Sequence, residues 1–299
     1  MIKVAIVGYG NIGRAVYEAL EAAPDMEIPG VVIRDRSKAG EKGVPRGLAV
    51  AEDIAALGAV DVAMLCVPSR SVPDVAESLL TRGIHTVDSY DIHKEEMLAL
   101  YNKLDQAGKK YNAVAVIGAG WDPGIDTMMR GIFEFSAPRG ITYTNFGPGM
   151  SMGHTVAVKS IAGVRKALSV TIPTGAGVHR RMVYIEVEAG HDFGAICAGI
   201  KNDPYFVHDE THVMQVEDVA ALQDVGHGVR MERKGVAGQS DNQLFSFDMR
   251  INGPAVTAQV MVAAARASVR QQPGCYTLLD IPVAYMLPGK REDLVRRLV

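Results

Sequence analysis

The sequence predicts an α/β protein, in which a Rossmann-type doubly wound, mostly parallel sheet is joined to a second, α+β domain for substrate binding and oligomerisation. Short, continuously apolar runs alternate with helical segments through residues 1–120, which is the pattern of strands buried on both faces of a parallel sheet. After Gly120 the rhythm changes, and apolar residues alternate only partly with polar ones. The chain has 299 residues, more than one hydrophobic core usually serves, so we expect two domains.

The first strand ends in glycines at G-x-G-x-x-G spacing. An apolar run at residues 4–7 leads into Gly8-Tyr9-Gly10-Asn11-Ile12-Gly13, and residues 15–20 have the composition of a helix. In such a turn the glycines allow a tight bend, close approach of the backbone to a pyrophosphate and close packing of the helix, whose N-terminus presents free N–H groups. The segment therefore predicts a dinucleotide site. A glycine-rich turn without a ligand is the alternative.

The end of the second expected strand, residues 28–34, bears on the choice of dinucleotide. It falls about 20 residues beyond the glycines, where an NAD enzyme carries an acid for the ribose 2′-hydroxyl. Here the residues are Arg34, Asp35 and Arg36. Guanidinium groups suit bidentate contact with a 2′-phosphate, which favours NADP. Asp35 supports NAD instead, because an acid beside the ribose repels phosphate, and exposed arginines can also be merely solvated.

The next segments repeat the alternation. We expect strands at residues 48–50, 61–68, 84–88 and 112–118, with a helix after Glu52. Ligands bind at the carboxyl edge of such a sheet, so Ser69, Arg70, Asp91 and Asp122 are expected to border a crevice there. Ser69 and Arg70 have an alternative role as caps of the next helix. Asp122, followed by a proline, has an alternative role as an N-cap with Pro123 at the first helical position.

The second domain is expected at residues 121–253, with strands at 142–146, 181–187 and 243–251. A helix at 255–270 and a strand at 275–281 are expected to return to the dinucleotide domain, which would then comprise 1–120 and about 254–299. The loop 145–154 carries Phe146, Met152 and His154 and has the character of a wall that shapes a substrate. The alternative is a long connection with these apolar residues in the core.

Composition and charge limit the class of partner. The net charge of −3 argues against a nucleic-acid groove or an anionic membrane surface as the main partner, so we expect a small-molecule substrate. The three cysteines, Cys66, Cys197 and Cys275, lack metal-like spacing, and we expect all three to be reduced and no metal to bind. No apolar run approaches a membrane span, and the first strand begins at once, so a cytoplasmic protein is expected.

Several stretches together resemble the meso-diaminopimelate dehydrogenase family, over nearly the whole chain. They are residues 8–13, 85–91, 119–124, 142–154, and 203–206 with 224–232. The most distinctive are Ala119-Gly120-Trp121-Asp122-Pro123-Gly124 and the segment 143–154. The glycine fingerprint is shared with many families.

The resemblance implies an activity and a cofactor. The reaction is the NADP-dependent oxidative deamination of meso-2,6-diaminopimelate at its D-centre, giving L-2-amino-6-oxopimelate and ammonia, with reductive amination as the reverse, in lysine and diaminopimelate biosynthesis. A homo-oligomer, a dimer or higher, is expected because cytosolic two-domain dehydrogenases are commonly symmetric assemblies. A broader D-amino-acid dehydrogenase acting on 2-keto acids and a non-catalytic NADP-binding sensor are the alternatives, since a fold alone does not fix a function.

The resemblance also implies site residues. Together with the fingerprint and Arg36, the cofactor contacts would be Gly8, Tyr9, Gly10, Asn11, Ile12, Gly13, Ile33, Arg34, Asp35, Val67, Pro68, Ser69, Arg70, Ser89, Tyr90, Asp91, Trp121, Asp122, Pro123 and Gly124. The reacting end of the substrate would be surrounded by Asp91, Asp122, Phe146, Met152 and Gly153, and the distal L-centre held by Thr171, Arg181 and His227. The family places an asparagine directly before a proline where this chain has Gly253, so Asn252 is expected to substitute for it.

The expected chemistry agrees with these residue types. A substrate with two ammonium and two carboxylate groups needs acids and cations separated along its site, as Asp91 and Asp122 are from Arg181 and His227. Hydride leaves the α-carbon only when the amine is neutral, so an acid close to the ammonium, or a water that it orients, has to take the proton. Asp91 and Asp122 are therefore the expected catalytic residues.

Overall fold

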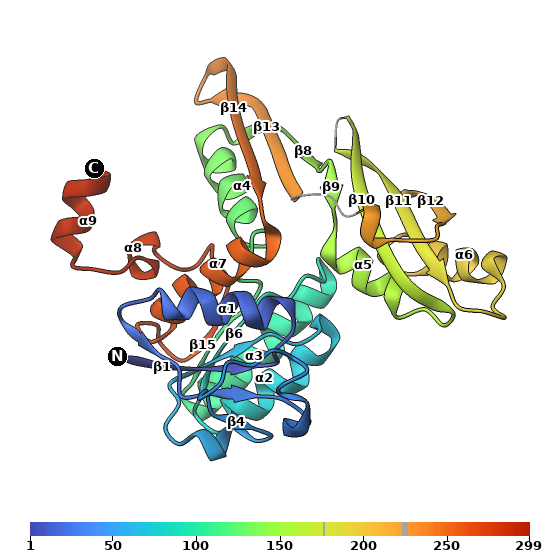
Figure 1. The fold of residues 1–299 in the computed structure, drawn as a ribbon. Coiled ribbons are helices and arrows are strands. Elements are labelled where there is room, and N and C mark those ends of the chain that lie inside the picture. Colours follow the sequence, from blue (N-terminus) through green and yellow to red (C-terminus); the bar gives the residue numbers. More distant parts are fainter. Residues whose placement is uncertain (176, 223–226) are drawn as a thin grey trace. The chain divides into compact units, whose positions relative to one another are not determined.

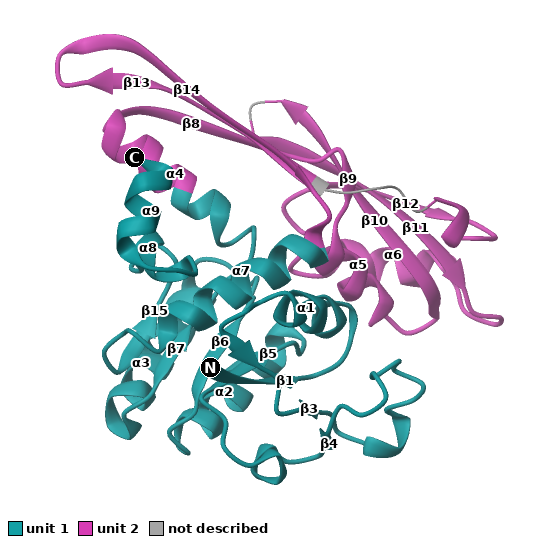
Figure 2. Ribbon diagram, turned by 60° about the vertical axis from the view of Figure 1, so that its left-hand side comes forward, with its two compact units in different colours: residues 1–128, 254–299 teal, residues 129–253 magenta. Residues whose placement is uncertain are grey.

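The computed structural model describes residues 1–175, 177–222 and 227–299, and their contacts divide the chain into two compact units (Figure 2). Unit 1 comprises Met1–Met128 and Pro254–Val299, and unit 2 comprises Met129–Gly253. The predicted boundary after residue 120 thus lies inside unit 1. The C-terminal segment belongs to unit 1, so unit 2 is an insertion into it.

Unit 1 is built on a parallel sheet in the order β15-β7-β6-β5-β1-β3-β4, with β2 paired to β1 beside this path. Every ladder in this sheet is parallel. The doubly wound fold predicted from the alternating apolar runs is confirmed. Its strands are β1 (Ile2–Val7), β2 (Met26–Glu27), β3 (Val31–Val32), β4 (Val50–Ala51), β5 (Val62–Leu65), β6 (His85–Asp88), β7 (Val114–Val116) and β15 (Gly274–Tyr276).

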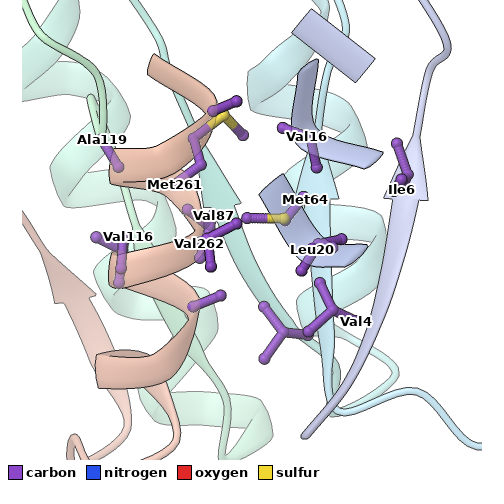
Figure 3. Packing of buried hydrophobic residues seen from close by; sticks show 14 of the residues in the cluster. Val4, Ile6, Val16, Leu20, Met64, Val87, Val116, Ala119, Met261 and Val262 are labelled. Carbon is purple, nitrogen blue, oxygen red and sulfur yellow. The ribbon is translucent and has the colours of Figure 1, made fainter. Parts of the chain in front are cut away.

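Helices cover both faces of this sheet, which is why its central strands β1, β5 and β7 are mostly apolar. Val4 and Ile6 of β1 pack with α1 (Asn11–Glu21) and α7 (Gly253–Ser268) in one cluster, shown in Figure 3. The alternate residues Ala5 and Val7 pack on the other face with α2 (Val72–Leu80) and α3 (Glu95–Tyr111). Successive side chains of a strand point to opposite faces, so a strand between two helical layers has no polar side.

Three predicted elements of unit 1 are shorter or different in the structure. Of the strand expected at 28–34, only β3 at Val31–Val32 forms, and β2 lies before it; Pro29, between the two, lacks an N–H for the ladder. The helix expected after Glu52 is a single 3₁₀ turn, Ile54–Leu57, which ends at Gly58 in a left-handed conformation (φ 76°). The strand expected at 275–281 ends at Tyr276, where Asp280 accepts the Thr277 N–H at 2.8 Å and closes a turn.

Two short helices end the chain in unit 1, α8 (Val283–Met286) and α9 (Arg291–Leu298). Arg266 of α7, nearly fully buried, donates to both carboxylate oxygens of Asp25 at 2.5 and 2.8 Å and to the carbonyl of Met286 at 3.0 Å. One guanidinium group therefore ties α7 to the turn before β2 and to the C-terminal segment.

Unit 2 contains two sheets (Figure 1). The first has the order β12-β11-β10-β9, with antiparallel ladders except for the parallel pair β11 and β12. The second has the order β14-β13-β8 and is antiparallel. The strands are β8 (Arg139–Phe146), β9 (Gly149–Met150), β10 (Val164–Gly175), β11 (Val178–Val187), β12 (Glu210–Gln215), β13 (His227–Ala237) and β14 (Ser240–Ile251). This mixed α+β content was predicted.

Each sheet of unit 2 packs on helices. Val158 of α5 (Met152–Lys159) and Ile196 of α6 (Phe193–Asn202) share a buried cluster with Val183 and Ile185 of β11. Phe133 of α4 (Ile125–Ser136), a helix that crosses the boundary between the units, packs on Phe245 of β14 with ring centroids 5.6 Å apart. Odd-numbered residues of β11 therefore lie on the face that the helices cover.

Candidate active site

The predicted cofactor residues of unit 1 all follow the carboxyl ends of parallel strands. Because neighbouring strands are parallel, these segments share one edge of the sheet. The strand order changes direction at β1, which has β3 on one side and β5 on the other, and such a switch point is where open α/β sheets bind ligands. The segments are 8–13 after β1, 33–36 after β3, 67–70 after β5, 89–91 after β6 and 121–124 after β7.

The three glycines of the first turn have different surroundings. A Cβ atom on Gly8 would lie 2.4 Å from the carbonyl oxygen of Cys66, and one on Gly13 would lie 2.3 Å from that of Gly8, so close packing requires glycine at both. Nothing lies within 4 Å of such an atom on Gly10, which is the N-cap of α1 and makes no side-chain cap. An open backbone at an uncapped helix N-terminus fits a pyrophosphate.

Three side chains predicted at this edge are buried in the core. Tyr9, Ile33 and Tyr90 are each 4% exposed. Tyr9 packs edge-on against Tyr17, with ring centroids 6.5 Å apart. Contact with a cofactor at these three positions is therefore limited to the backbone.

The segment after β3 is organised by Asp35. Its carboxylate accepts the Ser37 N–H at 3.0 Å and the Ser37 hydroxyl at 2.5 Å, and thus caps the 3₁₀ turn Arg36–Lys38. Arg34 and Arg36 are exposed, and within the described part of the chain neither guanidinium has a hydrogen bond or an ion pair. The acid of this segment is engaged in its own turn, whereas the two cations face solvent.

Ser69 and Asp91 connect the segments after β5 and β6. The Ser69 hydroxyl donates to the Asp91 carboxylate at 2.6 Å, and the Asp91 N–H donates to Ser69 Oγ at 3.4 Å. The structure therefore brings these two predicted residues together. The hydrogen bond fixes the orientation of the carboxylate predicted to serve the substrate amine.

Asp88, which sequence reasoning did not select, is the buried anchor of this edge. Its Oδ1 accepts the N–H of Tyr90 at 2.9 Å and that of Gly118 at 3.1 Å, whereas Oδ2 is buried and has no hydrogen-bond partner among the described residues. Burial raises the pKa of Asp88 from 3.8 to about 6. An acid at the end of a predicted strand is the sequence feature that could have identified Asp88.

The loop after β7 is closed on itself. The Gly120 N–H donates to the Pro123 carbonyl at 3.1 Å, the Asp122–Pro123 peptide is cis, and a Cβ atom on Gly124 would lie 1.8 Å from the Gly120 carbonyl oxygen. Helix α4 begins at Ile125. The N-cap interpretation of Asp122, with Pro123 at the first helical position, is therefore wrong. Trp121 and Asp122 are both partly exposed in this loop.

The substrate residues predicted in unit 2 lie where its elements begin and end. Phe146 ends β8, and Met152 and Gly153 form the first turn of α5. Asn252 follows the end of β14 and directly precedes α7, and it is exposed. The Phe146 ring lies 5.4 Å from the His179 ring and 6.0 Å from the Arg130 guanidinium.

Thr171 and Arg181, predicted to bind the distal centre, are direct partners across β10 and β11. Arg181 donates through Nη1 to the Thr171 hydroxyl and through Nε to Asp209 Oδ2 at 2.6 Å. The side chains of Arg181 and Asp209 are 11% and 22% exposed. This is a half-buried cation with one carboxylate partner. The side chain of His227 lies outside the described residues, although its backbone pairs with Ile251.

Among the described residues, no group of His, Cys, Asp and Glu side chains is arranged to hold a metal ion, and no helix is long and apolar enough to cross a membrane. Cys66, Cys197 and Cys275 are free thiols.

A glycine turn at the switch point of a doubly wound sheet defines a protein with a Rossmann-type dinucleotide-binding fold. In agreement, residues 2–114 match the oxidoreductase family with an NAD-binding Rossmann fold, and residues 120–178 match the diaminopimelic acid dehydrogenase C-terminal domain. A meso-diaminopimelate D-dehydrogenase of Bacteroides fragilis is 58% identical over 100% of this chain and 99% of that protein. The chain belongs to the meso-diaminopimelate dehydrogenase family, as its sequence motifs predicted.

Solved structures agree with this assignment. A C. glutamicum DAP dehydrogenase in complex with DAP superposes with a TM-score of 0.90 at 28% identity, over 100% of this chain and 99% of that one. An engineered D-amino acid dehydrogenase bound to NADP⁺ gives a TM-score of 0.88 at 28% identity, with the same coverage. Both parts of the chain are thus matched at full length.

Proposed function

We propose that this chain catalyses the NADP-dependent oxidative deamination of meso-2,6-diaminopimelate at its D-centre, giving L-2-amino-6-oxopimelate and ammonia, and the reverse reductive amination. The observation that carries the proposal is the 58% identity to a meso-diaminopimelate D-dehydrogenase over the full chain. The paired Thr171 and Arg181 support it, because a cation beside a hydroxyl suits the distal carboxylate of a two-headed substrate.

The preference for NADP rests on the segment after β3. Asp35 accepts two hydrogen bonds from Ser37 through Oδ1 and lies 3.8 Å from the Lys38 ammonium, whereas Arg34 and Arg36 are exposed cations. Guanidinium groups bind phosphate in a bidentate manner. The NADP⁺ bound to the engineered D-amino acid dehydrogenase supports the same cofactor.

The proton is assigned to the acids after β6 and β7. Asp91, oriented by Ser69, or Asp122 takes it from the substrate ammonium directly or through a water, because only a neutral amine allows hydride to leave. The nicotinamide, when bound, accepts that hydride. Phe146, Met152 and Gly153 would align the reacting carbon, and Arg181 with Thr171 would select the end that is held.

A stereoisomer assay tests the proposal. The purified protein is mixed with LL-, DD- or meso-diaminopimelate and with NADP or NAD, and the reduced cofactor is followed by absorbance. We expect turnover with the meso isomer and NADP. Absence of activity on the meso isomer, or equal activity on the LL and meso isomers, would contradict the proposal.

A second arm addresses the alternatives. Reductive amination of simple 2-keto acids at rates like those with the diaminopimelate product would favour a broader D-amino-acid dehydrogenase. Cofactor binding without turnover of any substrate would favour a sensor. The homo-oligomer stays a prediction, which sedimentation of the purified protein would test.

A further inference from the structure

His179 joins the two sheets of unit 2. It lies on β11, and its Nε2 accepts the backbone N–H of Phe146, the last residue of β8, at 2.8 Å. The two rings are also in contact, with centroids 5.4 Å apart and planes tilted by 42°. Because β8 and β11 belong to different sheets, this side chain connects the end of one sheet to a strand of the other, and Asn145 Oδ1 of β8 accepts the nearby Gly177 N–H at 2.9 Å.

The same place connects the two groups of substrate residues. His179 is two residues before Arg181 on β11, so both lie on one face of the strand. A Cβ atom on Gly147, next to Phe146, would lie 2.3 Å from the carbonyl oxygen of Thr171, so the end of β8 also packs closely on β10. His179 therefore stands between Phe146 at the expected reacting end and the pair of Thr171 and Arg181 at the expected distal end.

The hydrogen bond defines the state of the ring. Because Nε2 accepts a hydrogen bond from a backbone N–H, the ring is neutral and its own proton is on Nδ1. Burial and the charge of Arg181 lower the pKa of His179, and Asp209 opposes them. Arg130 adds a further cation 6.0 Å from the Phe146 ring. The surroundings of His179 thus favour the neutral imidazole, which is the form that accepts the Phe146 N–H.

We propose that His179 is a positioning residue, whose neutral imidazole sets the separation between the Phe146 wall and the Thr171–Arg181 pair and so adapts the site to a substrate with two amino-acid centres. The identity of the substrate in this proposal rests on the proposed function. The contacts of His179 with Phe146 do not depend on that function.

Variants separate this role from simple packing. His179→Leu removes the acceptor and leaves the Phe146 N–H unpaired, and we expect KM for meso-diaminopimelate to rise about tenfold with a smaller change in kcat. His179→Gln can place an oxygen close to the position of Nε2 and is expected to restore most of KM. His212→Leu is the matched control, because His212 is exposed on β12 and its side chain bonds to Glu210 at 2.7 Å.

A readout independent of turnover completes the test. The chain contains seven phenylalanines, so selective ¹⁵N-phenylalanine labelling gives a simple amide spectrum in which Phe146 is assigned by substitution. We expect the Phe146 amide to shift as the pH falls below about 6.5, and the shift to be absent in His179→Gln, which does not titrate there.

The possible failures are distinct. No turnover of meso-diaminopimelate by the wild type would refute the proposed function and leave the amide titration to decide the role of His179. A Phe146 amide that does not respond to pH, or a His179→Leu variant that loses thermal stability while keeping the wild-type KM, would overturn the positioning role.

Discussion

The carboxylate of Asp88 accepts the backbone N–H of Gly118 at 3.1 Å and so joins the ends of β6 and β7. The same oxygen accepts the N–H of Tyr90, which begins the segment that leads to Asp91. Asp88 thus fixes the backbone of two loops at the cofactor edge from inside the protein. Burial of this carboxylate is costly, because its second oxygen has no hydrogen-bond partner in the part of the chain that the structure describes.

Replacement of Asp88 by Asn is expected to stabilise the protein above neutral pH. The pKa of Asp88 is raised from 3.8 to about 6 by burial, so between these values the folded chain binds more protons than the unfolded chain and loses stability as the pH rises. Asp88→Asn keeps one acceptor and does not titrate. The difference in free energy of unfolding between Asp88→Asn and wild type should therefore grow in favour of the variant by on the order of 3 kcal/mol from about pH 4 to pH 8. Urea denaturation at both pH values checks this, and an equal difference at both would contradict it.

Arg34 and Arg36 are expected to decide the choice of cofactor. Arg34→Ala and Arg36→Ala should each raise KM for NADP about tenfold or more, because a charged hydrogen bond contributes about 1.5–3 kcal/mol, and should leave KM for NAD nearly unchanged. Arg46→Ala, at an exposed site in the following loop, is the control. Equal losses with the two cofactors would argue against a 2′-phosphate contact.

Substitution of Arg181 is expected to weaken substrate binding more than substitution of Asp209. Arg181→Ala should weaken substrate recognition by about 1.5–3 kcal/mol if the guanidinium binds the distal carboxylate. Asp209→Asn keeps the shape but removes the charge that holds Nε, so KM should rise by a smaller factor. Arg180→Ala is the control, because Arg180 alternates with Arg181 to the other face of β11 and pairs with Glu210. An unchanged KM in Arg181→Ala would refute the role.

The ion pair of Arg266 and Asp25 is expected to govern acid stability. The hydrogen bond from Arg266 lowers the pKa of Asp25 below 3.8, so its contribution is present above about pH 4 and is lost as the pH falls through the lowered value. Asp25→Asn leaves a buried guanidinium without its counter-charge and should cost on the order of 3 kcal/mol at pH 7. The difference from wild type should shrink under acid. Thermal melts at pH 7 and pH 3 check this, with the exposed Asp293→Asn as the control.

The parallel sheet and its glycine turn could be predicted because both depend on local sequence. Most of the strands are short apolar runs. The turn has no room for a side chain at Gly8 and Gly13, and the spacing of glycines in the sequence records this requirement. The predictions were wrong where the same short sequence pattern is compatible with two local structures. An Asp-Pro pair predicts an N-cap, whereas here Gly124 closes a loop and delays the helix to Ile125.

His179 and Asp209 could not be found from sequence. Their bonds join residues that are 33 and 28 positions apart, and no periodicity links a histidine on one strand to the backbone N–H at the end of another. The motif around Phe146 predicted a substrate wall, and only the structure shows which side chain holds it. Long-range pairings of this kind depend on the register of β10 and β11, which the sequence pattern does not specify.

The return of the C-terminal segment to unit 1 affects how the chain folds while it is being translated. Strand β15 and helix α7, with the buried Arg266, come from Pro254–Val299, after the whole of unit 2. A ribosome therefore releases the last edge strand and one covering helix of the parallel sheet only at the end of translation. Until then, the face of the sheet that α1 and α7 share is covered by α1 without α7, while the inserted unit is made.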